Sequence, residues 1–175
     1  MRWSRKTRSP LSSTSVKADR PEPGFGQDAW KAWVPALLWL GVISAESSDF
    51  FSSQRTGNVL YSLLTAILGQ IDPFVFSVWH GYLRKAGHAA GYGLLSLFFF
   101  RAWRATLLLR DAPRWALRWA RISLLTTVVV AGVDEWHQSY LPARSGNVGD
   151  VMLDSAAALA VQVLLWAWLR KARAA

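Results

Sequence analysis

The chain has 175 residues, a length that one soluble domain could fill, but 52% of them are apolar and the charges are bunched between apolar runs. The formal net charge of +9 would suit a nucleic-acid binder, yet the positions of the charges favour anionic lipid and we expect no nucleic-acid partner. The absence of cysteine excludes disulfides and thiolate metal sites. Many of the eleven Trp residues lie near the ends of apolar runs, where indoles favour a membrane interface.

Residues 1–28 are polar and basic and contain three prolines, so we expect a disordered basic cytoplasmic tail. No apolar stretch follows Arg8 at the distance that a signal peptide requires. The first predicted span is Trp30 to Ala45, which is short for about 20 residues of membrane. It ends at Glu46, Ser47 and Ser48, so its outer end is expected in a polar, protein-lined setting.

Residues 46–84 form a long connection with two apolar stretches, Asn58 to Ile71 and Phe74 to Leu83, separated by the breaker Asp72-Pro73. Both stretches are too short for a confident span. We predict one or two short outer-face helices that are interfacial or partly re-entrant, and a hairpin through the bilayer is the alternative.

The remaining predicted spans are Lys85 to Arg101, Ala116 to Val133 and Asp150 to Leu169. The predicted fold class is an all-α membrane protein with four transmembrane helices. They would form one domain over residues 29–170, followed by a basic tail at 171–175. Several glycines in the second span would allow another helix to approach it closely.

The basic residues predict the orientation of these spans. Sixteen of the twenty Lys and Arg residues fall on one side: seven in the N-terminal segment that includes Lys31, six from Arg101 to Arg121 and three at the C-terminus. By the positive-inside rule that side is cytoplasmic, so both termini are expected inside a multi-pass cytoplasmic membrane protein. The stretch from Asp134 to Gln138 would then face outward.

That topology brings polar residues from three spans to one outer face. They are Lys85, His88, Tyr92, Asp134, Glu135, Gln138, Asp150 and Asp154. The first three share one helical face by spacing. Asp150 is explained by its place at a helix N-terminus, whereas Asp154 lies one turn further in and needs a partner, for which Arg144 or Lys85 is the natural choice. We expect Tyr92 in the core with its hydroxyl bonded to an acid or a carbonyl.

This set of residues, in this order and with Arg144 between its last two parts, resembles the VanZ-like family of small bacterial multi-span membrane proteins. The resemblance covers about residues 35–169. It implies that the family's polar positions correspond to Lys85, His88, Tyr92, Asp134, Glu135, Gln138, Arg144, Asp150 and Asp154. Family members often carry Asn where Asp154 stands, and Gly where this chain has Ala156 to Ala158. The family takes its name from a member linked to low-level resistance to teicoplanin, which acts on the cell wall.

Three interpretations of the cluster remain open. It is a structural ion-pair network, or it binds an outer headgroup such as a lipid-linked phosphate or a cell-wall precursor through Lys85 and Arg144. In the second case a divalent metal could offset the excess of carboxylates. The third interpretation is catalysis, with His88 as a base oriented by Glu135 or Asp134. No motif for a nucleophile or a metal is present, so no metal and no cofactor are predicted.

We therefore expect an integral membrane protein of the bacterial cell envelope whose partners are the bilayer and a cell-wall or lipid component that it binds or modulates, with a possible link to glycopeptide resistance. A non-enzymatic role is favoured. The alternative is an intramembrane hydrolase or transferase acting on a lipid-linked substrate. A small transporter is disfavoured because no inverted repeat or pair of broken helices is visible.

Overall fold

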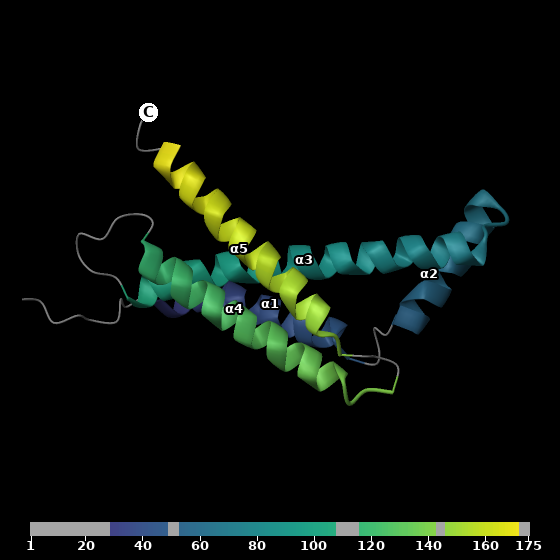
Figure 1. Ribbon diagram of the computed structural model, residues 1–175, viewed down its shortest axis with the longest axis horizontal. Coiled ribbons are helices and arrows are strands. Elements are labelled where there is room, and N and C mark those ends of the chain that lie inside the picture. The colour runs from purple at the N-terminus through teal and green to yellow at the C-terminus, as the bar shows by residue number, and fades with distance from the viewer. Residues whose placement is uncertain (1–28, 49–52, 108–115, 143–145, 172–175) are drawn as a thin grey trace, which may run out of the picture.

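The computed structural model describes residues 29–48, 53–107, 116–142 and 146–171, which form five α-helices and no strand (Figure 1). The helices are α1 (Ala29–Glu46), α2 (Ser53–Leu68), α3 (Pro73–Thr106), α4 (Leu117–Gln138) and α5 (Val148–Lys171). Helix α3 contacts each of the other four and is the centre of the bundle. The predicted tail at 1–28 and the last residues of the C-terminal tail lie outside the described residues.

The all-helical class is confirmed: α1, α4 and α5 match three of the predicted spans to within about five residues at each end, and the predicted span Lys85 to Arg101 lies inside α3. Among the described helices, α5 alone is long and apolar enough to cross a membrane by length and composition. Only 17% of its apolar window is buried inside the protein, whereas the core helix of a soluble protein is mostly buried.

The prediction that a separate short helix ends near Leu83 is wrong, because α3 runs without a break from Pro73 to Thr106. The sequence near Arg84 changes from aromatic to basic residues. It contains neither a proline nor a capping pattern, and those are the features that end a helix. At 1.5 Å per residue, its 34 residues span about 51 Å. Its N-terminal half projects beyond the bundle, and α2 lies beside that half (Figure 1).

The turn between α2 and α3 follows from its sequence. Gly69 adopts φ +85°, a left-handed conformation that ends α2. Asp72 then caps α3, since its Oδ1 accepts hydrogen bonds from the backbone N–H groups of Phe74 at 2.7 Å and Val75 at 3.4 Å. The Tyr61 hydroxyl donates to the carbonyl of Ile71 at 2.9 Å, which holds α2 against the turn. The predicted breaker at Asp72-Pro73 is confirmed.

Indole N–H groups attach α1 to the C-terminal half of α3. Trp33 Nε1 donates to Thr106 Oγ1 at 2.9 Å, and Trp39 Nε1 donates to the Gly91 carbonyl at 2.8 Å. These pairs make the two helices antiparallel, and they bring the end of α1 toward the part of α3 that carries His88. The apolar core between α1, α3 and α4 contains Ala36, Ile43, Tyr92, Leu95, Phe99 and Ala131.

A buried polar network joins α3, α4 and α5 near the middle of the bundle. Gln162 Nε2 donates to Ser96 Oγ at 2.8 Å, to the Ser96 carbonyl at 3.1 Å and to Ser123 Oγ at 3.3 Å. Ser123 Oγ donates to the same Ser96 carbonyl at 2.6 Å. Nearby, a Cβ atom on Gly93 would lie 3.1 Å from a methyl group of Val161, so the glycine allows α3 and α5 to pack closely.

Replacing Gln162 with leucine should test this network. Gln162→Leu retains a side chain of similar size but removes the donor that Ser96 and Ser123 share, so we expect the free energy of unfolding to fall by about 1–3 kcal/mol. Chemical unfolding of the purified protein in detergent measures this change. Leu164→Ala, at a side chain that is 67% exposed, is the control and should change stability by less than about 0.5 kcal/mol. Equal stability of Gln162→Leu and wild type would show that the network does not hold the helices together.

Candidate functional site

The predicted polar residues that the structure describes gather at the end of the bundle where α4 ends and α5 begins. Helix α3 carries Lys85, His88 and Tyr92, α4 carries Asp134, Glu135 and Gln138, and α5 carries Asp150 and Asp154. Arg144 lies outside the described residues.

Tyr92 is at the inner edge of the cluster, with its side chain 1% exposed. Its hydroxyl donates to Asp134 Oδ2 at 2.8 Å, as the sequence predicted. The same carboxylate oxygen accepts a hydrogen bond from Gln138 Nε2 at 3.0 Å, and that amide lies 3.4 Å from Ser47 Oγ at the end of α1. Asp134 thus joins α4 to α3 directly, and through Gln138 to the residue that follows α1, which is sufficient to explain why a carboxylate lies there.

Two neighbouring pairs connect α3 to α5. Lys85 Nζ lies 4.0 Å from Asp150 Oδ1 in a partly exposed ion pair, and His88 Nδ1 lies 3.5 Å from Asp154 Oδ2. The sequence predicted Lys85 or Arg144 as the partner of Asp154, and for Lys85 this is wrong. The two helices run in the same direction here, so one turn along α3 matches one turn along α5, and His88 rather than Lys85 is level with Asp154.

Glu135 is held by the segment that enters α5. Its Oε2 accepts a hydrogen bond from the backbone N–H of Asn147 at 2.8 Å. Gly146 is required beside it, because a Cβ atom there would collide with the Glu135 carbonyl oxygen. Glu135 lies beyond the apolar run that ends at Val133. Burial raises the pKa of its carboxyl above the ordinary value, and the Asn147 N–H opposes that shift.

One donor atom from each of His88, Glu135 and Asp154 lies within 4.8 Å of the other two. The three residues come from three different helices, and Glu135 and Asp154 are buried. An imidazole between two carboxylates can take up and release a proton, or it can share a cation with them. The sequence placed all three in one cluster but did not indicate that these three converge.

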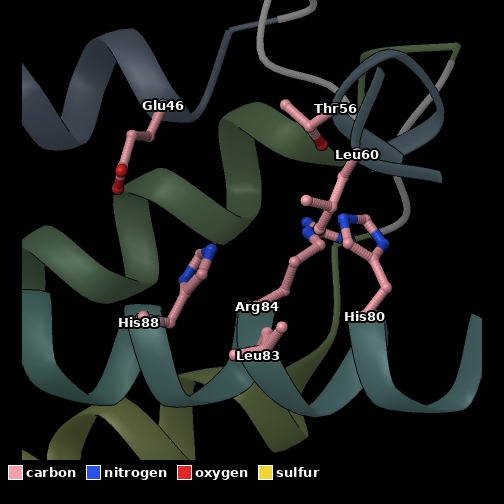
Figure 2. A pocket seen from close by; sticks show the side chains of 8 residues that line it. Glu46, Thr56, Leu60, His80, Leu83, Arg84 and His88 are labelled. Atoms are coloured by element: carbon pink, nitrogen blue, oxygen red, sulfur yellow. The ribbon is translucent and has the colours of Figure 1, made fainter. Parts of the chain in front are cut away.

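A pocket of about 300 Å³ opens beside this cluster, between the end of α1, α2 and α3 (Figure 2). Figure 2 shows Arg84 and His80 extending from α3 beside Leu60 of α2, while Glu46 at the end of α1 points toward His88. Thr56, Leu83 and Gly87 complete the lining. Glu46 is one of the residues at which the first predicted span ends in a polar setting.

Sequence reasoning did not find the part of this pocket formed by His80 and Arg84. His80, Arg84 and His88 are spaced i, i+4 and i+8, which places them on one face of a continuous helix. The spacing is visible in the sequence, but the assumed end of a helix near Leu83 separated His80 from the other two. No residue near Leu83 ends the helix, so the sequence does predict that His80, Arg84 and His88 share one helical face.

The order and spacing of these residues can be compared with known families. A family model described as VanZ/LLP1 matches residues 32–170, which is most of the chain. The chain belongs to the VanZ-like family. No curated protein and no solved structure matches it. The VanZ-like region includes α1 to α5 almost entirely, so both the polar cluster and the pocket lie within it.

A methyl group at Gly146 should disrupt the support of Glu135. Gly146→Ala would force the segment before α5 away from the end of α4 and break the Asn147–Glu135 hydrogen bond, so we expect a loss of about 1–3 kcal/mol in unfolding free energy. Thermal unfolding in detergent measures the loss. Gly132→Ala on α4 is the matched control, because nothing lies within 4 Å of a Cβ atom there. A Gly146→Ala protein as stable as this control would contradict the close approach.

Proposed function

We propose that this VanZ-like protein is an integral protein of the bacterial cytoplasmic membrane that binds the phosphate-bearing headgroup of a lipid at its outer polar end. The distribution of polarity supports the membrane part of this proposal. Buried polar side chains such as Ser96, Thr127 and Gln162 lie inside the bundle, while large apolar side chains lie on its surface. Those with exposed fractions above 60% include Trp30, Leu38, Leu125, Val129, Leu164 and Trp168. Lipid, unlike water, accommodates such a surface.

The pocket carries the binding part of the proposal. Its lining places the Arg84 guanidinium, a group that binds phosphate with two parallel hydrogen bonds, between His80 and His88 on one face of α3. Leu60 and Leu83 line the same pocket, so apolar atoms next to a phosphate would also find contacts. A phosphate attached to an apolar chain matches this combination better than a free phosphate ion does.

The direction of the pocket follows from the charge asymmetry. If the basic segments at the N-terminus, from Arg101 to Arg121, and at the C-terminus are cytoplasmic, the pocket and the polar cluster face outward. Lipid-linked cell-wall precursors and phospholipids present phosphate headgroups on that side. Binding or modulating a cell-wall component is therefore the role that we propose. A link to teicoplanin resistance is a finer form of the proposal and is supported by the family resemblance alone.

Hydrolysis or transfer on a lipid-linked substrate is the second candidate function. It is favoured by His88, which lines the pocket and also faces the buried carboxylate of Asp154. That arrangement suits a group that removes or delivers a proton beside a bound headgroup. The two candidates share one site and differ in whether the bound lipid is changed.

Single cysteines should test the topology, since the chain contains none. Tyr140→Cys, at a side chain that is 69% exposed after the end of α4, should react with a membrane-impermeant maleimide in intact cells with a permeable outer layer. Lys171→Cys at the end of α5 should react only after the cytoplasmic membrane is opened. Labelling in the reverse order would show that the orientation is inverted, and labelling of both from outside would exclude an odd number of spans between them.

Substitution of Arg84 should test the binding site. Arg84→Gln should weaken binding of a polyprenyl phosphate to the purified protein by about 10-fold or more, because one charge-assisted contact contributes about 1.5–3 kcal/mol. Native mass spectrometry in detergent measures the bound fraction, with phosphatidylglycerol as a second probe.

Arg55→Gln is the matched control, because Arg55 is an exposed arginine of α2 that does not line the pocket. Equal loss in the two variants would show that only general charge attracts the lipid. Release of phosphate from a polyprenyl diphosphate, abolished by His88→Gln, would establish the second candidate function.

A further inference from the structure

The Asp154 carboxylate is buried at the centre of the polar cluster without a hydrogen-bond partner among the described residues. It is 1% exposed, and within the described part of the chain neither of its oxygens accepts a hydrogen bond. His88 Nδ1 faces it at 3.5 Å and likewise has no hydrogen-bond partner among the described residues. Burying a carboxylate without such partners is costly, by several kcal/mol even after the surroundings relax. A further positively charged species between these groups would remove that cost.

The third group at this point is Glu135. Its carboxylate is fixed by the Asn147 N–H, so its position does not depend on His88 or Asp154. One atom from each of the three residues lies within 4.8 Å of the other two, which puts two carboxylate oxygens and one imidazole nitrogen around a common point. Cations bound by such ligands have metal–ligand distances of about 2.0–2.2 Å, which spans at most about 4.4 Å. A small inward movement of the side chains is therefore enough to bring all three into contact with one ion.

We propose that His88, Glu135 and Asp154 bind a divalent transition-metal ion. The imidazole disfavours Mg²⁺ and Ca²⁺, which prefer oxygen ligands alone, and suits Zn²⁺, while the two carboxylates also suit Mn²⁺. The two carboxylates neutralise the charge of the ion, and the metal provides the partners that Asp154 lacks. Three protein ligands leave a coordination position for water or another oxygen, as in metal sites that act on a substrate.

The site joins α3, α4 and α5, so a bound ion would also hold these helices together. His88 is shared with the pocket, and the ion would lie next to it. The metal proposal does not depend on the proposed headgroup binding, because its ligands are all protein atoms. It can be tested in detergent with no lipid added.

Metal content of the purified full-length chain tests the proposal. After removal of metals with a chelator, equilibrium dialysis against micromolar Zn²⁺ or Mn²⁺ should leave about one ion per chain, and the ion should raise the temperature of unfolding. Asp154→Asn and Glu135→Gln should each weaken binding at least 100-fold and abolish the rise in unfolding temperature. Asp134→Asn is the matched control. It removes a carboxylate next to Glu135 that is bonded to Tyr92 and Gln138 instead, and it should leave metal binding within about threefold of wild type.

Binding of Co²⁺ to the wild-type protein gives a second measurement, which does not depend on whether the Asp154 and Glu135 variants fold. Wild-type protein loaded with Co²⁺ should show visible absorption from a nitrogen- and oxygen-ligated ion, and Zn²⁺ should displace it. His88→Cys, which offers a sulfur ligand at the same place, should add a thiolate charge-transfer band. Absence of stoichiometric metal from wild type, or equal binding in Asp154→Asn and Asp134→Asn, would overturn the proposal. Asp154 would then be a structural group that faces His88 alone.

Discussion

The structure depends on one constraint: a polar group buried between its helices is costly unless it has a partner, and several of these groups find one on another helix. Helix α3 meets this need along its whole C-terminal half. The Ser96 carbonyl receives hydrogen bonds from α4 and α5, Tyr92 donates to α4, and the Gly91 carbonyl receives the indole N–H of Trp39 in α1. In a bundle whose outer surface is largely apolar, hydrophobic contact alone would not select one arrangement of helices. These hydrogen bonds fix which faces meet and in which register.

The sequence predicted the helices better than it predicted where one of them begins. Apolar runs located α1, α4 and α5 to within a few residues, because composition and length determine such runs directly. The N-terminal half of α3 was predicted as a separate short helix because a change of polarity at Arg84 and Lys85 was interpreted as the end of an element. Polarity reports the surroundings of a helix, whereas only backbone chemistry ends it. Asp72-Pro73 has that chemistry, and there the prediction was right.

For the candidate site too, the sequence predicted which residues share a face of one helix but not how the helices meet. Spacing on single helices placed Lys85 and His88 on one face and put Asp150 and Asp154 one turn apart. The structure adds that these faces meet in register, so each group of α3 lies opposite one acid of α5. That register cannot be predicted from one helix alone, because it depends on the close packing of α3 and α5 at Gly93 and on the segment at Gly146. The convergence of Glu135 on the same point depends on the Asn147 N–H, a contact between residues twelve apart that periodicity cannot indicate.

The two proposals for the polar end meet at His88. Four acids belong to the cluster and a fifth, Glu46, lines the pocket, and they would repel the phosphate that Arg84 is suited to bind. A divalent cation between Glu135 and Asp154 removes most of that repulsion and presents a positive charge beside the pocket. An anionic headgroup would then bind more tightly in the presence of the metal, and the metal would bind more tightly in the presence of the headgroup, by the same factor. This reciprocity explains why an anion-binding pocket would lie next to a group of buried carboxylates.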